Sequence, residues 1–238
     1  MQHPSLETIA ARLSELLHCG QEDLCRPIIQ HVARGKPVTK ADLQISLHLS
    51  PDELEQRLAH LPDTEFDHSG NIVGWGVTLL PTSHQFQLDG KALYTWCAFD
   101  TVLFPPSLQR SAQVQSSCAQ TGHRITFVAT PEGVVKDLTP SGSVISLILP
   151  AERSECVRDI FCSHSLFFQS EQAASTFLST HPEAVLLSVE EAAQVGRWVA
   201  QSRFTETQEA EGVSVDQKHE RGRNDARLAE RCLSESGG

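Results

Sequence analysis

The sequence lacks a hydrophobic run long enough to cross a membrane. No stretch of about 18 apolar residues occurs anywhere along it. Its first residues are amphipathic and lack the basic start and apolar run of a secretion signal. We therefore expect a cytoplasmic protein, in a compartment where thiols stay reduced.

A basic surface is also missing. The 238 residues carry a formal net charge of −11, with 19 Lys and Arg against 30 Asp and Glu, and no run of Lys and Arg. Binding to nucleic acid depends on such cationic groups, so we expect no nucleic-acid partner. Hydrophobic residues make up 39%, which suggests that part of the chain contributes nothing to a core.

No Cys-x-x-Cys pair occurs among the seven cysteines. Zinc ribbons and thioredoxin-like redox sites therefore lack their usual signature. An odd number of cysteines without close pairing also argues against a disulfide framework. Any one of them is as readily a small buried hydrophobe as a reactive group, so the surrounding sequence has to decide. The cysteines are Cys19, Cys25, Cys97, Cys118, Cys156, Cys162 and Cys232.

Apolar periodicity and composition divide the chain into three parts. Residues 1–80 predict helices followed by a short hairpin, an order that resembles a winged-helix unit. The acidic residues on these helices favour a scaffold over a DNA-binding role. Residues 81–204 predict an α+β domain, with a mixed, mostly antiparallel sheet and helices. Residues 205–238 are charged and poor in large apolar residues, which predicts a disordered tail.

The segment at residues 92–104 places a thiol and a carboxyl among apolar residues. We expect a helix that is buried on most sides and stopped by Pro105. Cys97 and Asp100 would then share one face, about 5–6 Å apart at their Cβ atoms. A buried carboxylate is costly unless paired. Asp100 therefore either caps a turn or meets an arginine, or it has a raised pKa and donates a proton near neutral pH.

A second thiol-bearing segment, RDIFCSHSLFF, contains Cys162 and His164. If this segment is a strand, the two side chains lie on one face. Cysteines flanked by phenylalanine are usually core residues. Combined with the separate pair of Cys97 and Asp100, however, this segment offers soft metal ligands together with a proton source.

Four motifs in this order resemble the alkylmercury lyase (organomercurial lyase) family. They are LYTWCAFDTVLFP, SSCAQTG, SLILP and VRDIFCSHSLFF, preceded by GKPV and EFDHSGNIVGWGVTL, which are also similar to the family. The similarity runs from roughly residue 16 to residue 199. The combination of W-C-A-x-D-T with F-C-x-H-x-x-F-F is its most specific part.

The resemblance implies an enzyme that breaks carbon–mercury bonds by protonating the carbon. Matched position by position, Cys97, Asp100 and Cys162 are the catalytic residues and Cys118 is structural. The resemblance implies no organic cofactor, Hg²⁺ as the bound product, and release to cytosolic thiols or to mercuric reductase. One difference is Ser163, because family members often carry a second adjacent cysteine there.

These roles give a reaction scheme. We expect Cys97 to capture the organomercurial, Cys162 to add as a second thiolate, and Asp100 to protonate the carbon. A thiolate has to bind the metal, so one cysteine should ionise readily, or Asp100 should take its proton. The product Hg²⁺ would be held by Cys97 and Cys162, with Asp100 as a weak third ligand.

Tyr94, Trp96 and Phe161 are expected to line an apolar pocket for the organic group, although Trp96 and Phe161 are better explained by default as core residues.

Two non-enzymatic alternatives stay open. One is a winged-helix metal sensor that holds Zn²⁺ or Hg²⁺ through Cys97, Cys118 and Cys162, which leaves Asp100 unexplained. The other is a homologue that sequesters mercury without cleaving it.

Overall fold

The structure is a computed structural model, and it describes residues 4–18, 20–61, 63–149 and 157–204. The predicted tail at 205–238 lies outside the described residues, as do Cys19, Cys156 and Cys232. None of the described helices is both long enough and apolar enough to span a membrane.

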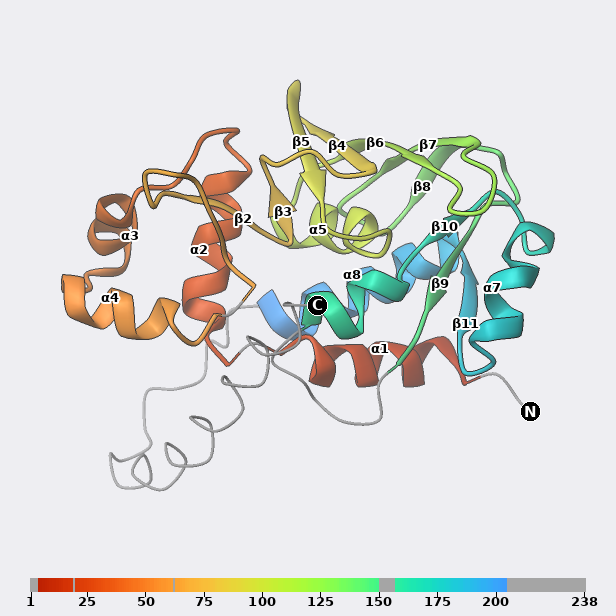
Figure 1. Ribbon diagram of the computed structural model, residues 1–238, viewed down its shortest axis with the longest axis horizontal. Coiled ribbons are helices and arrows are strands. Elements are labelled where there is room, and N and C mark those ends of the chain that lie inside the picture. The colour runs from red at the N-terminus through yellow and green to blue at the C-terminus, as the bar shows by residue number, and fades with distance from the viewer. Residues whose placement is uncertain (1–3, 19, 62, 150–156, 205–238) are drawn as a thin grey trace.

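The N-terminal part contains helices followed by a short hairpin, as the sequence predicts (Figure 1). The short helices α3 and α4 each begin at a capping box, formed by Thr39 with Asp42 and by Ser50 with Glu53. Pro51 takes the first helical position of α4, where its missing N–H leaves no bond unmade. The helices are α1 (Leu6–Leu16), α2 (Glu22–Val32), α3 (Lys40–Leu47) and α4 (Pro51–Leu58).

The strands form a larger sheet in the order β1-β2-β3-β5-β4-β6-β7-β8 and a smaller one in the order β10-β9-β11. Each strand pair in the described residues is antiparallel, which confirms the expected α+β class. The larger sheet consists of β1 (Glu65–Phe66), β2 (Ile72–Trp75), β3 (Val77–Thr78), β4 (His84–Leu88), β5 (Lys91–Thr95), β6 (Ala112–Ser117), β7 (Arg124–Ala129) and β8 (Val135–Thr139). The smaller sheet consists of β9 (Val144–Leu147), β10 (Phe167–Phe168) and β11 (Val185–Ser188).

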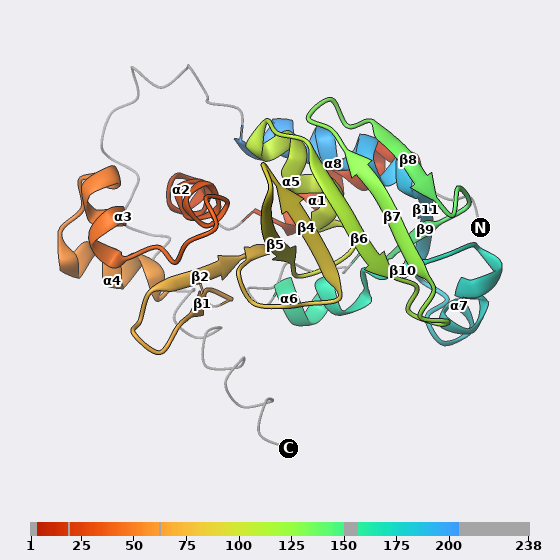
Figure 2. The ribbon, with the colours of Figure 1, turned by 90° about the horizontal axis from the view of Figure 1, so that it is seen from above.

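Helices cover one face of the larger sheet. Figures 1 and 2 show α5 and α8 beneath this sheet, with α1 on the far side of α8. The backbones of α5 and α8 approach closely, since a Cβ on Gly196 would lie 2.9 Å from the Val102 carbonyl oxygen. The helices of this part are α5 (Asp100–Leu108), α6 (Val157–Ile160), η1 (Cys162–His164), η2 (Gln172–Ala174), α7 (Ser175–Thr180) and α8 (Val189–Phe204).

The expected single helix across residues 92–104 is wrong. The segment instead ends strand β5 at Thr95, turns, and begins α5 at Asp100. Pro105 lies inside that helix rather than after it. The cause is tertiary pairing, because β5 is bonded to β4 on one side and to β3 on the other. A strand between two neighbours presents a continuous apolar run that periodicity alone does not distinguish from a buried helix.

Two further expectations change. The segment that carries Cys162 and His164 forms short helical turns, α6 and η1, and not a strand. The argument against disulfides is wrong at Cys25, which is disulfide-bonded. Cys97, Cys118 and Cys162 are free and buried.

Candidate active site

Cys97 lies in the turn between β5 and α5, and backbone hydrogen bonds fix this turn. Trp96 donates its N–H to the carbonyl of Gly76 at 3.0 Å, and the Thr95 hydroxyl donates to the Cys97 carbonyl at 3.1 Å. Asp100 is the first residue of α5, so its carboxyl stays next to the turn that presents the thiol.

Cys162 comes from a distant part of the chain and is held by the smaller sheet. Ser146 on β9 is fully buried, and its hydroxyl donates to the His164 carbonyl at 2.7 Å. The same oxygen accepts the Leu166 N–H at 3.2 Å. Ser165, which lies between these two residues, accepts backbone bonds from the Cys97 turn. The two thiol-bearing segments are therefore joined to each other and to β9.

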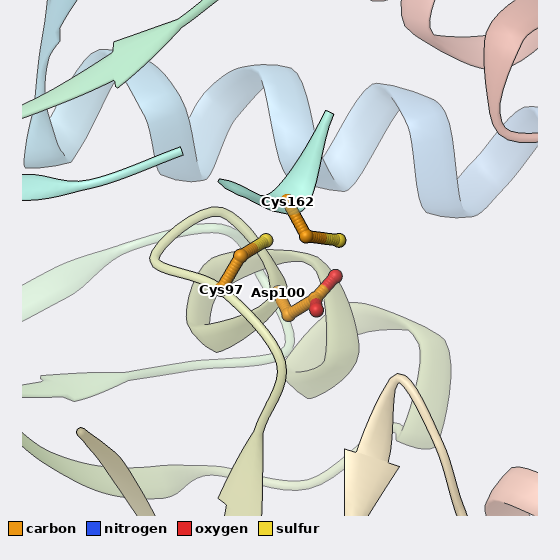
Figure 3. A group of neighbouring side chains, drawn as sticks. All are labelled: Cys97, Asp100 and Cys162. Carbon is orange, nitrogen blue, oxygen red and sulfur yellow. The ribbon is translucent and has the colours of Figure 1, made fainter. Parts of the chain in front are cut away.

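The structure brings together the three residues that the sequence singled out. The Cys97 sulfur, the Cys162 sulfur and one carboxyl oxygen of Asp100 all lie within 4.8 Å of one another (Figure 3). Their side chains point toward a common centre, and the residues are 0%, 7% and 6% exposed. Two soft sulfur ligands beside a carboxyl suit a soft metal ion.

The three groups also form a directed chain of hydrogen bonds. The Cys162 thiol donates to the Cys97 sulfur, and the Cys97 thiol donates to the Asp100 carboxylate. A backbone N–H of each residue in the Cys97–Asp100 pair also bonds the side chain of the other. This arrangement gives a proton a path from either thiol to the carboxyl.

Asp100 has the electrostatics of a proton donor. Burial raises the pKa of its carboxyl to about 7, against the opposing effects of the hydrogen bonds from Cys97 and of the charges of Arg203 and Arg158. Its Oδ2 is buried and has no hydrogen-bond partner among the described residues. A carboxyl with a pKa close to neutral both holds and gives up a proton there.

The thiols behave differently from what the sequence suggested. Burial raises the pKa of Cys97, and the Asp100 charge adds to the effect. The pKa of Cys162 lies well above its usual value, because its thiol donates a hydrogen bond to Cys97 and is also buried. The pKa of each thiol is therefore raised in this site, which favours the second of the two expectations, that Asp100 takes the thiol proton. A proton has to leave as a metal binds.

The residues proposed for an apolar pocket lie around this group in different ways. Phe161 is buried and packs edge-on against Phe99, with ring centroids 5.9 Å apart. Trp96 is half-buried and lies 6.1 Å from the ring of Trp75. Tyr94 is half-buried on β5. Their role in lining a pocket stays a prediction.

Sequence reasoning gave no partner for Arg158, which stands just before the second thiol. Its guanidinium lies 5.1 Å from the centre of the Trp96 ring and forms an ion pair with Glu65 on β1 at 2.6 Å. The partner is 93 residues away in the chain, so no local sequence pattern predicts the contact. Arg158 thereby links the Cys162 segment to the N-terminal hairpin.

Cys118 lies outside the group of three. It follows β6, is 2% exposed, and donates its N–H to the His123 carbonyl at 2.8 Å. Burial raises the pKa of its thiol, but hydrogen bonds from the Thr121 side chain and from backbone N–H groups, including that of Gln169, outweigh burial and lower it. No acid or second thiol among the described residues joins it in a metal-binding group, and its structural role stays a prediction.

Two family models match successive parts of the chain. The one described as the helix-turn-helix domain of alkylmercury lyase matches residues 8–76, and the one described as alkylmercury lyase matches residues 77–201. Together they cover most of the described residues.

Whole proteins of the same description are similar over most of their length. Alkylmercury lyase of Staphylococcus epidermidis is 37% identical over 207 residues, which are 85% of this chain and 94% of that protein. That of Bacillus cereus is 37% identical over 216 residues, covering 89% and 98% of the two chains. That of Pseudomonas putida is 39% identical over 173 residues, covering 73% and 81%.

A solved structure shows the same fold. The mercury-bound form of MerB2 superposes with a TM-score of 0.68 over 76% of this chain and 90% of its own, at 23% identity. With family models across both parts and relatives near their full length, the chain belongs to the alkylmercury lyase family.

Proposed function

We propose that this protein is an organomercurial lyase that works through Cys97, Asp100 and Cys162. The observation that carries the proposal is the convergence of two buried thiols and one buried carboxyl with a pKa of about 7, all within 4.8 Å. The three groups meet three needs of the reaction, which are capture of the metal, weakening of the carbon–mercury bond and delivery of a proton.

In the first step, the Cys97 sulfur replaces the ligand X of an organomercurial R–Hg–X. A sulfur–mercury bond forms, a mercury–X bond breaks, and the thiol proton leaves through Asp100. The hydrogen bond from the Cys97 thiol to the carboxylate provides that route. Mercury is the substrate here, and thiolate is its preferred protein ligand.

In the second step, Cys162 adds to the same mercury and its proton passes to Asp100. The added thiolate pushes electron density onto the carbon, which then takes the proton from Asp100 as the carbon–mercury bond breaks. The overall change is R–Hg–X and two thiols giving R–H, a mercury dithiolate and HX. No electrons are gained or lost, and the carboxyl ends as it began.

The product Hg²⁺ stays on Cys97 and Cys162, with the Asp100 carboxylate as a weak third ligand. The scheme uses no organic cofactor. We propose that release requires a thiol acceptor, either a small cytosolic thiol or mercuric reductase. The need for free thiols supports a reducing compartment such as the cytoplasm.

The apolar surroundings support the same scheme. Phe161 and the Trp96 ring adjoin the thiol segments and would shelter the organic group from water, with Tyr94 nearby on β5. A water-poor site strengthens the proton transfer and keeps the weakened bond from other donors.

The test is headspace gas chromatography of the purified protein with methylmercury and excess thiol. We expect many equivalents of methane per protein above the protein-free control. Cys97→Ser and Cys162→Ser should each abolish methane release, and Asp100→Ala should keep stoichiometric mercury binding while turnover is lost. Cys118→Ser, with its folding checked by thermal melting, is the matched control and should retain turnover.

Three results would contradict the proposal in whole or in part. Stoichiometric mercury binding by the wild type without methane would favour sequestration. A DNA mobility shift at low salt, together with absent turnover, would favour the winged-helix sensor. Normal cleavage by Asp100→Ala would remove Asp100 from the role of proton donor.

A further inference from the structure

Ser165 lies between the two thiol-bearing segments and is 0% exposed. It closes the turn η1 that carries Cys162, with its N–H bonded to the Cys162 carbonyl at 3.2 Å. A polar side chain that is fully buried at such a junction has to satisfy its hydrogen bonds within the protein. Where those bonds go shows what the residue holds in place.

Both polar ends of Ser165 bind the turn that carries Cys97. Its carbonyl accepts the Ala98 N–H at 3.1 Å, and its hydroxyl oxygen accepts the Phe99 N–H at 3.0 Å. The hydroxyl proton remains free to donate, and the Ser165 side chain hydrogen-bonds the Cys97 sulfur. One residue on the Cys162 segment thus contacts the backbone and the sulfur of the Cys97 segment.

Ser165 is itself fixed from behind. The residues on either side of it, His164 and Leu166, are bonded to the buried hydroxyl of Ser146 at 2.7 Å and 3.2 Å. The Ser146 N–H also donates to the Leu166 carbonyl at 2.9 Å. A shift of Ser165 would break these bonds. The bonds to β9 therefore fix the position of Ser165, and Ser165 in turn fixes the position of the Cys97 turn.

We propose that Ser165 is a positioning residue that holds the Cys97 sulfur in line with Cys162 and Asp100. This inference rests on the proposed function, and it adds a residue that acts through the Cys97 sulfur. Capture of a mercurial needs only one sulfur. Transfer to two sulfurs and protonation of the carbon need all three groups in register, so Ser165 serves the second stage.

The first test compares Ser165→Ala, Ser165→Thr and Ser163→Ala with the wild type in steady-state cleavage of methylmercury. Ser165→Ala should lower kcat by on the order of tenfold to a hundredfold, because small misplacements of reacting groups have effects of that size. KM and the stoichiometry of mercurial binding should stay close to those of the wild type. A loss of this kind is confined to the chemical step.

The two other variants separate positioning from general packing. Ser165→Thr keeps the hydroxyl and should keep most of kcat. Ser163→Ala is the matched control, because Ser163 lies in the same turn, is exposed, and donates to the Asp159 carbonyl. Its kcat should be that of the wild type. Equal loss in Ser165→Thr and Ser165→Ala, or an unchanged kcat in Ser165→Ala, would overturn the role.

A second readout does not depend on cleavage. Inorganic Hg²⁺ bound by the two sulfurs is removed by a competing dithiol, and the mercury that stays with the protein after desalting measures how tightly the site holds it. Ser165→Ala should yield Hg²⁺ at about tenfold lower dithiol, in the range known for residues that orient metal ligands. Identical competition curves would refute positioning even if the wild type released no methane. Absent methane with a clear shift would count against the proposed function alone.

Discussion

The Asp100 carboxyl destabilises the folded state whenever it is charged. It is 6% exposed, and burial raises its pKa from the usual 3.8 to about 7. A group that binds protons more tightly in the folded state makes folding less favourable as pH rises between the two pKa values. The penalty is absent below the lower value and complete above the higher one.

Replacement of Asp100 by asparagine should therefore stabilise the protein at alkaline pH. The gain in unfolding free energy over the wild type should grow between about pH 4 and about pH 7, to on the order of 4 kcal/mol. Urea unfolding of both proteins across this range measures the difference. Asp159→Asn, at an exposed carboxyl on α6, is the control and should show no such growth. A gain that is constant with pH would mean that ionisation of Asp100 is not its source.

The rate of cleavage should depend on the same carboxyl with the opposite sign. Below its pKa, Asp100 is protonated and cannot accept the proton of the incoming thiol. The titratable and charged groups that interact with this carboxyl are Cys97, Cys162, Arg158 and Arg203. We expect kcat/KM to rise with pH through about 7. This ratio follows the titration of groups in the free enzyme, and the pKa of Asp100 is about 7. The inflection should vanish in the residual activity of Asp100→Asn. A fall in the wild type through this range would mean that the resting proton of Asp100 is the one consumed.

Among these residues, local sequence revealed only part of the site. The spacing of Cys97 and Asp100 predicted that they lie together, although through a helix that does not exist. Cys162 was assigned by resemblance to a family, since nothing local links it to a turn 65 residues earlier. Ser165 gave no signal at all, because serine is common in loops and its partner Phe99 is 66 positions away.

At the scale of elements, the turn between β2 and β3 packs closely against α5 at Gly76, whose carbonyl also accepts the Trp96 N–H. Gly76 has φ of +74°, and a Cβ there would lie 2.3 Å from the Phe104 ring, so the strand turn and the helix meet without space for a side chain. The regular helices and β-rich runs of the sequence were predictable from periodicity. The turn at Cys97 was not, because the sheet pairing of β5 depends on residues elsewhere in the chain.

The contact between α5 and α8 gives an element-level prediction. Glycine to alanine in a helix usually stabilises by about 0.5–1 kcal/mol. Gly196→Ala should instead destabilise by about 1–3 kcal/mol, because its Cβ would lie 2.9 Å from the Val102 carbonyl oxygen, and the backbone there cannot yield cheaply. Chemical denaturation measures this, with Gln194→Ala on the exposed face of α8 as the control. Stabilisation by Gly196→Ala would show that the two helices separate at little cost.

Across the whole molecule, the helical part and the sheet part share one core. Buried residues of α1, such as Leu13, belong to the same apolar cluster as Val195 of α8, and Ser202 donates to Ser14 at 2.8 Å. The predicted division of the chain at residue 80 stays a prediction. A shared core argues against independent unfolding of two parts.

We therefore expect a single cooperative unfolding transition. Tryptophan fluorescence and far-ultraviolet circular dichroism should give coincident denaturation curves, although fluorescence reports on Trp75, Trp96 and Trp198 and circular dichroism on the helices of both parts. A chain shortened to the sheet part would expose the face of α8 that α1 covers, and should lose the transition. Two separated transitions in the full chain would show that each part folds on its own.

The burial of the three reacting groups also decides when exchange with solvent takes place. A sulfur with no exposed surface cannot meet a solute, so every turnover must include a transient opening that admits the mercurial. Once the hydrocarbon has left, closure of this opening keeps the ion with its two sulfurs. In the proposed scheme, the time for which the product stays bound then depends on how often the site opens, because an acceptor thiol reaches the ion only during an open interval.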